Sequence, residues 1–286
     1  MNINKTKRAV LFHDMSCFGR CALSVIIPVI SVLNVQPVII PTALLSTHTG
    51  GFTGFTFLDL TEEIRKITEH YEELGVIPEC IYTGFLGSIK QIEIISGYIE
   101  KQKSRGAYIF IDPVMGDDGR LYSSYTENMR KGMAELACMA DIITPNITEA
   151  FFLLGMDYKS PPYSKDFING MIYDLFELFD IKKIVITGTV FENGEYGVAY
   201  GEKNAEKNRN IMETGYIFTR RHEKDYPGSG DIFSSILCAK IMNGGELEGA
   251  ILSAVEFIDK VMGYTIKENT PVREGLIFER FLPELI

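Results

Sequence analysis

The feature that most constrains the fold is the regular alternation of short apolar runs with longer segments of helical periodicity. Strands that alternate with helices form a mostly parallel sheet with helices on both faces. The ligands of such sheets bind beyond the carboxyl ends of the strands. We therefore expect an α/β fold whose site lies at that edge. The predicted strands are residues 9–12, 37–40, 80–83, 107–111 and 141–144.

The last third of the chain changes pattern but continues the same body. We expect a hairpin at Asn193-Gly194, a polar loop at 201–210, a strand near 216–219 and helices at 231–243 and 247–262. No repeat, low-complexity segment or linker divides the chain. With 286 residues, of which 46% are hydrophobic, residues 1–286 are expected to form a single domain.

The charge balance limits the class of partner. The net charge is −10 and no block of Lys or Arg is present, which argues against nucleic acid and against an anionic membrane surface. No segment approaches the length of a membrane span or a signal peptide. The five cysteines are scattered, which is typical of reduced thiols in a cytoplasm and gives no zinc pattern.

Residues 226–233 read Tyr-Pro-Gly-Ser-Gly-Asp-Ile-Phe and lead into a helix. Gly228 and Gly230 flank Ser229, so the backbone N–H groups can converge at the positive end of the helix dipole and bind phosphate. A carboxylate beside phosphate is repulsive unless it has a task, and Asp231 could accept the proton of an attacking hydroxyl. The alternative is a glycine-rich turn in which Asp231 only complements the dipole.

Two further acidic residues follow predicted strands. Asp112 precedes Pro113 at the end of one strand, and Glu149 lies in the first helical turn after Thr144-Pro145-Asn146. As an alternative, each of these residues could have a purely structural role, in a turn or in a helix cap. Together, and facing an anion site, they predict a site for Mg²⁺, which prefers few carboxylates and several waters. Asp14 and Thr187-Gly188 also follow strands, and the Gly/Thr-rich segment 42–57 is a candidate flap over the site.

The chain lacks a Gly-x-x-x-x-Gly-Lys-Ser/Thr loop, a dinucleotide-binding Gly-x-Gly-x-x-Gly after the first strand and a Gly-x-Ser-x-Gly elbow. Its motifs instead resemble the ribokinase-like superfamily, and within it the pyridoxal kinases. The resemblance covers nearly the whole chain in the same order. It rests on residues 46–50, 83–87, 112–117 with Gly119 and Leu121-Tyr122, 144–146 with Glu149, and 228–231.

This resemblance implies a three-layer α/β/α sandwich with a mostly parallel central sheet and a short flap. It implies ATP-dependent phosphorylation of the 5'-hydroxymethyl group of pyridoxal, pyridoxine or pyridoxamine, with Mg²⁺ and a homodimer; whether a monovalent cation such as K⁺ takes part stays open. The implied roles are catalysis by Asp231, an anion hole at Gly228, Ser229 and Gly230, ATP binding by Asn146, Thr187 and Gly188, substrate binding by Asp14, Thr49 and Phe85, and metal binding by Asp112 and Glu149.

Three positions depart from the family pattern. Asp14 stands where many pyridoxal kinases have serine, Phe85 where many have tyrosine, and Ser229 where threonine is usual. The first two affect how a substrate ring is recognised, so the related hydroxymethylpyrimidine kinases of thiamine metabolism remain the alternative. A protein that binds nucleotide or vitamer without turnover is a second alternative, although an Asp beside the anion loop is unnecessary for binding alone.

Overall fold

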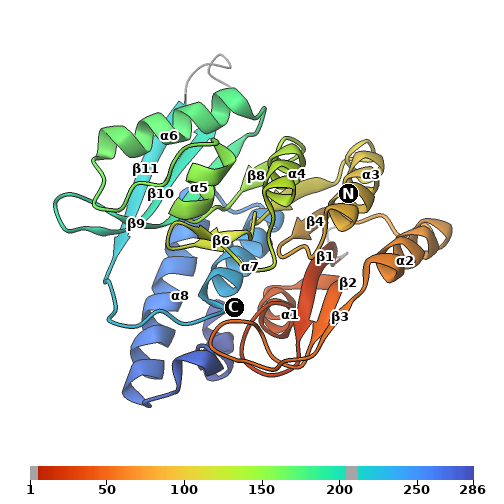
Figure 1. Ribbon diagram of the computed structural model, residues 1–286, viewed down its shortest axis with the longest axis horizontal. Coiled ribbons are helices and arrows are strands. Elements are labelled where there is room, and N and C mark those ends of the chain that lie inside the picture. The colour runs from red at the N-terminus through yellow and green to blue at the C-terminus, as the bar shows by residue number, and fades with distance from the viewer. Residues whose placement is uncertain (1–5, 204–211) are drawn as a thin grey trace.

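The computed structural model describes residues 6–203 and 212–286, and its centre is one nine-stranded sheet (Figure 1). Most neighbouring strands are parallel, whereas β3 at one edge and β10 and β11 at the other pair antiparallel. In spatial order the strands are β11 (Met212–Thr219), β10 (Tyr196–Lys203), β9 (Lys183–Val190), β8 (Ile142–Ile143), β5 (Tyr108–Ile111), β4 (Cys80–Thr83), β1 (Lys7–Ser16), β2 (Val35–Leu45) and β3 (Phe57–Asp59).

Helices cover both faces of this sheet, as Figure 1 shows. One face carries α1 (Leu23–Val32), α7 (Ser229–Met242) and α8 (Leu247–Lys267), with the short 3-10 helices η1 (Val272–Glu274) and η2 (Glu279–Leu285). The other carries α2 (Thr61–Glu73), α3 (Ile89–Lys103), α4 (Glu127–Ala137), α5 (Ile147–Leu153) and α6 (Lys165–Leu178). The predicted three-layer α/β/α arrangement is therefore confirmed.

The central strands are buried on both sides, which explains their continuous apolar sequence. Along β1, Val10 and Phe12 point into the core beneath α3 and α4, while Ala9 and Leu11 point into the core beneath α1 and α7. The alternation along one strand thus joins two hydrophobic cores. In the part of the chain that the structure describes, no helix is long and apolar enough to cross a membrane.

Several predicted bounds change. β2 extends to Leu45, because its backbone pairs with β1 as far as Ser16 and with β3 from Ala43 to Leu45; the predicted flap 42–57 is therefore a strand end followed by a loop at 46–56. Asp59 ends β3, and its Oδ1 accepts the N–H of Thr61 at the start of α2, 2.9 Å away. Of the predicted loop 201–210, residues 201–203 belong to β10 and the rest lie outside the described residues.

One small hairpin completes the architecture near the carboxyl ends of the strands. It consists of β6 (Gly116–Asp117) and β7 (Arg120–Leu121), which pair antiparallel. Gly116 fits there because a Cβ atom at this position would lie 2.3 Å from the carbonyl oxygen of Arg120. The hairpin begins four residues after Asp112 and contacts α5, so it links two of the predicted site segments.

Candidate active site

The predicted anion-binding turn, Gly228, Ser229 and Gly230, lies at the amino terminus of α7, and we call it the anion mouth. Gly228 precedes the helix with φ of 83°, a left-handed conformation that favours glycine. A Cβ atom on Gly228 would also lie 2.0 Å from the carbonyl oxygen of Arg20, so this position excludes every side chain. A Cβ atom on Gly230 would meet nothing within 4 Å, which shows open space beside the first turn. The N–H of Ser229 makes one long hydrogen bond, 3.4 Å, to the carbonyl of Tyr226, so the first turn of α7 can still present its amides to an anion.

Asp231 lies in the same first turn and is partly buried. Its Oδ2 accepts the backbone N–H of Ala22 at 2.8 Å, and the sulfur of Cys21 is 3.5 Å from the same oxygen. Burial raises the pKa of Asp231, and the hydrogen bonds from Ala22 and Cys21 partly offset that rise. The carboxylate is thus held at the mouth of the anion site, with an increased affinity for a proton.

Asp112 follows β5 and faces the same helix. The hydroxyl of Ser234, one turn along α7 from Asp231, donates to Asp112 Oδ2 at 2.9 Å, and the hydroxyl of Thr144 lies 3.2 Å from that of Ser234. Burial raises the pKa of Asp112, and the negative charge of Asp231 raises it further. The structure therefore brings Asp112 and Asp231 into one electrostatic environment, as the strand-end argument predicts.

Glu149 is buried and forms a reciprocal capping box with Asn146. Its Oε2 accepts the N–H of Asn146 at 2.8 Å, and its Oε1 accepts the N–H of Met115 at 3.0 Å. Burial and the neighbouring Asp112 nevertheless raise its pKa well above the usual value. The capping role considered for Glu149 is thus present in the structure, and a role toward a metal would have to be additional.

The side chain of Asn146 is also engaged within the protein. Its Oδ1 accepts the N–H of Glu149 at 2.9 Å, and its Nδ2 donates to the carbonyl of Gly116 at 2.8 Å. Within residues 6–203 and 212–286, no group of three or more His, Cys, Asp or Glu side chains is arranged to hold a metal ion. A cation here would keep most of its ligands as water or phosphate.

Thr187 and Gly188 lie in β9, next to this capping box. The N–H of Thr187 donates to the carbonyl of Pro145 at 3.0 Å, which adds a bridge between Asn146 and Thr187. Gly188 has φ of 71°, and a Cβ atom there would meet nothing within 4 Å. Both residues are partly exposed, so they are accessible for the nucleotide contacts predicted from the family resemblance.

Asp14 differs from its predicted setting because β1 continues to Ser16, so Asp14 does not end the strand. It lies at an irregularity in the pairing with β2, where His13 is opposite Pro41 and Met15 is opposite Leu44. Its Oδ2 accepts the hydroxyl of Ser16 at 2.8 Å. Burial raises the pKa of Asp14 to about 6, and the charge of Asp231 contributes.

The two other predicted substrate residues lie in different loops, Thr49 after β2 and Phe85 after β4. Thr49 is exposed in the loop 46–56, and Phe85 is partly buried with its ring centroid 6.2 Å from that of Tyr125.

Sequence reasoning missed His48, which is buried although it lies in the same loop as Thr49. Its Nδ1 accepts the N–H of Gly50 at 3.1 Å, so Nε2 carries the hydrogen and donates to the carbonyl of Arg273 at 2.7 Å. His48 anchors the loop to the C-terminal segment.

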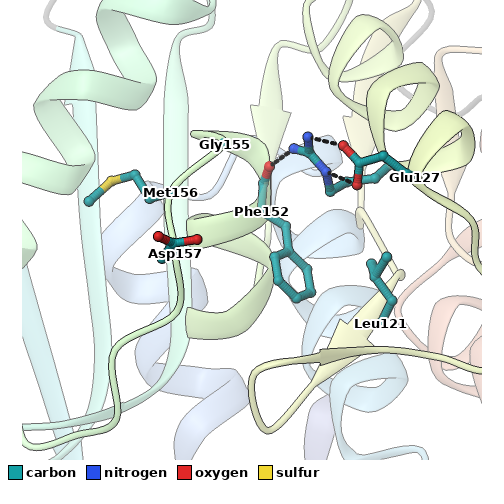
Figure 2. A pocket seen from close by; sticks show the side chains of 7 residues that line it. Leu121, Glu127, Phe152, Gly155, Met156 and Asp157 are labelled. Atoms are coloured by element: carbon teal, nitrogen blue, oxygen red, sulfur yellow. Dashed lines mark hydrogen bonds and ion pairs between the residues drawn. The ribbon is translucent and has the colours of Figure 1, made fainter.

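A separate cavity of about 230 Å³ lies between the start of α4, β7 and the end of α5 (Figure 2). Arg130 lines it and donates two hydrogen bonds to the carboxylate of Glu127 and one to the carbonyl of Phe152. Its guanidinium charge is therefore already paired. None of the predicted site residues lines this cavity, whose lining is Leu121, Glu127, Arg130, Phe152, Gly155, Met156 and Asp157.

A family model, related sequences and solved structures all show similarity between this chain and known kinases. Residues 27–273 match the model of the phosphomethylpyrimidine kinase family. Pyridoxine kinase of Bacillus subtilis is 28% identical over 204 residues, which cover 70% of this chain and 68% of the relative. Pyridoxal kinase of Lactobacillus plantarum superposes with a TM-score of 0.86 and 26% identity, covering 98% of this chain and 97% of the other. A Bacteroides thetaiotaomicron protein crystallised with pyridoxal gives a TM-score of 0.90 and 34% identity, covering 98% and 96%.

Proposed function

Because the chain belongs to the phosphomethylpyrimidine kinase family, we propose that it phosphorylates a vitamin B6 vitamer with ATP. The acceptor is the 5'-hydroxymethyl group of pyridoxal, pyridoxine or pyridoxamine, and the products are the 5'-phosphate and ADP. The observation that carries this proposal is the position of Asp231 in the first turn of α7, directly after an anion-binding glycine turn. The similarity of the chain to a pyridoxine kinase and a pyridoxal kinase over most of its length supports the choice of substrate.

In this reaction Asp231 accepts the proton of the 5'-hydroxyl group. The hydroxyl oxygen forms a bond to the γ-phosphorus, and the bond from that phosphorus to the bridging oxygen of ADP breaks. The amides of Gly228, Ser229 and Gly230 stabilise the negative oxygens of the transferred group, because the helix amino terminus presents N–H donors and a partial positive charge. The raised pKa of Asp231 favours its acting as a base near neutral pH.

The acidic residues fit a divalent cation held mainly through water. Burial raises the pKa values of both Asp112 and Glu149, and each is raised further by a carboxylate neighbour, so a nearby positive charge would favour their ionised forms. We propose that Asp112 and Glu149 would hold Mg²⁺, although the oxygens of Glu149 also accept backbone N–H groups. When bound, the cation would neutralise negative charge on the phosphates of ATP. Asn146, Thr187 and Gly188 complete the proposed nucleotide site.

The proposed vitamer pocket uses Asp14, Thr49 and Phe85, with the loop 46–56 as the flap. We further propose that the enzyme is cytoplasmic and acts as a homodimer. The edge strand β3 supports a dimer, because the side chains of Phe57 and Leu58 are 46% and 56% exposed there. Light scattering on the purified chain tests this: a monomeric mass would refute the dimer without affecting the kinase assignment.

Hydroxymethylpyrimidine is the second candidate acceptor. The matching family is described by its phosphomethylpyrimidine kinases, and Asp14 offers a carboxylate where the pyridoxal kinases usually have serine. A carboxylate can accept hydrogen bonds from the exocyclic amine of the pyrimidine as well as from a protonated pyridine. This chemistry does not separate the two rings, so the assay must include both.

The deciding experiment measures ADP release with pyridoxal, pyridoxine, pyridoxamine and hydroxymethylpyrimidine, and identifies the product by mass spectrometry. We expect ADP and a 5'-phosphate in equal amounts with at least one vitamer, at a higher kcat/KM than with hydroxymethylpyrimidine. A higher kcat/KM for the pyrimidine would transfer the assignment to that acceptor. Binding of ATP and vitamer without any ADP release would identify a binding protein instead.

A further inference from the structure

The carboxylate of Asp231 is held asymmetrically by a turn 210 residues earlier in the chain. The N–H of Ala22 and the thiol of Cys21 both approach Oδ2, at 2.8 and 3.5 Å. Among the residues that the structure describes, no hydrogen bond reaches Oδ1. One oxygen is therefore fixed and the other is free to accept a proton.

The turn that contains Cys21 and Ala22 is held in a specific conformation by its own hydrogen bonds. Ala22 adopts φ of 52° and ψ of −137°, a conformation that is strained for a residue with a side chain. The preceding Arg20 is bound by its N–H to the carbonyl of Glu274 at 3.1 Å, and the hydroxyl of Ser24 donates to the carbonyl of Cys21 at 2.7 Å. These bonds keep Ala22 in the conformation that aims its N–H at Asp231.

The chemical state of Cys21 suits a donor. Burial and the negative charges of Asp231 and Asp14 raise the pKa of its thiol well above the usual value. The sulfur therefore keeps its proton at neutral pH, and a protonated thiol next to a carboxylate donates a weak hydrogen bond. The same shift disfavours the thiolate that a nucleophilic role would require.

We propose that Cys21 is a positioning residue for Asp231: its S–H, together with the N–H of Ala22, fixes Oδ2 so that Oδ1 faces the substrate hydroxyl. This inference rests on the proposed function, in which Asp231 is the base. With Oδ2 held by two donors, rotation of the carboxylate about its Cβ–Cγ bond is restricted. Restriction matters because proton transfer needs the acceptor within hydrogen-bond reach and correctly oriented.

The test compares Cys21→Ala, which removes the donor, with Cys21→Ser, which keeps one. Loss of a weak hydrogen bond that acts on the base should lower kcat of Cys21→Ala by roughly 3- to 10-fold, with KM for ATP and vitamer changed by less than about twofold. Cys21→Ser should restore kcat to within about twofold of the wild type. Cys138→Ala is the matched control, because the thiol of Cys138 also donates one long bond, to the carbonyl of Ala134 at 3.4 Å, but lies exposed at the C-cap of α4.

A double-mutant cycle with Asp231→Asn separates positioning from general stability. If Cys21 acts through the base, then adding Cys21→Ala to Asp231→Asn should change the residual kcat by less than about twofold. Wild-type kcat in Cys21→Ala, equal impairment of the Ser and Ala variants, or additive losses in the cycle would overturn the inference. Failure of the proposed function is a different result: Asp231→Asn would keep full activity, or no acceptor would be phosphorylated at all.

Discussion

Replacement of Gly228 by alanine tests whether the anion mouth depends on the close contact between α7 and the turn at Arg20. At φ of 83° an alanine adopts the left-handed region, at a cost of roughly 1–2 kcal/mol. The new methyl group would also lie 2.0 Å from the carbonyl oxygen of Arg20, so the helix start or the turn must move. Such overpacking costs roughly a further 1–3 kcal/mol. The expected loss is therefore about 2–5 kcal/mol of unfolding free energy.

Two other glycines separate these contributions. Gly188 has φ of 71° but open space around its Cβ position, so Gly188→Ala should show only the conformational cost of roughly 1–2 kcal/mol. Gly230 has open space and lies in the first turn of α7, so Gly230→Ala should be neutral or stabilising by up to about 1 kcal/mol.

The assay is thermal unfolding followed by circular dichroism, because the chain contains no tryptophan to report by fluorescence. At roughly 2 °C per kcal/mol for a chain of this size, Gly228→Ala should lower Tm by about 4–10 °C and Gly188→Ala by about half as much or less. A Gly228→Ala protein as stable as Gly188→Ala would refute the argued contact with Arg20. A normal Tm in Gly228→Ala would also refute the left-handed conformation.

Three further predictions concern the other site residues. Burial raises the pKa of Asp14 to about 6, above its value in the unfolded chain, so the folded state keeps a proton that the unfolded chain releases; stability should fall as pH rises through about 4 to 6, and Asp14→Asn should remove this loss in Tm measured against pH. Glu149→Gln leaves one of two N–H donors without its carboxylate partner, so Tm should fall by about 2–6 °C, and an unchanged magnesium requirement of the rate would reject the metal role. Amide exchange across residues 48–53 should slow when vitamer and a non-hydrolysable ATP analogue are both bound, and equal exchange in the free and ternary forms would reject the flap.

The sheet and its helices were readable from the sequence because their signals are local. An apolar strand buried on both faces and an apolar stripe along a helix are visible in a short window, and most predicted elements lie within a few residues of the observed ones. Bounds that depend on partners were not visible. β2 continues to Leu45 because Leu44 and Leu45 pair with the end of β1, and no local pattern encodes that pairing.

In the candidate site, too, some features could be predicted from the local sequence and others depend on contacts between distant segments. The glycine turn before Asp231 could be read directly, since its residue types are those that a helix amino terminus needs in order to bind an anion. The Asn146-x-x-Glu149 spacing is typical of a helix capping box, and the structure shows that these two residues form one. The contact of Cys21 with Asp231 joins residues 210 apart, and the irregular pairing at Asp14 depends on β2; both require the tertiary fold.

The measurement that most directly tests the central claim is single-turnover phosphoryl transfer by Asp231→Asn. The variant keeps an acceptor oxygen for the N–H of Ala22 and the amides of the anion mouth, but it lacks a group that can take the proton. We predict that the rate of transfer falls by roughly 10²- to 10⁴-fold while the Kd for ATP, measured by calorimetry, stays within about threefold of the wild type. A transfer rate equal to the wild type would contradict the assignment of Asp231 as the base.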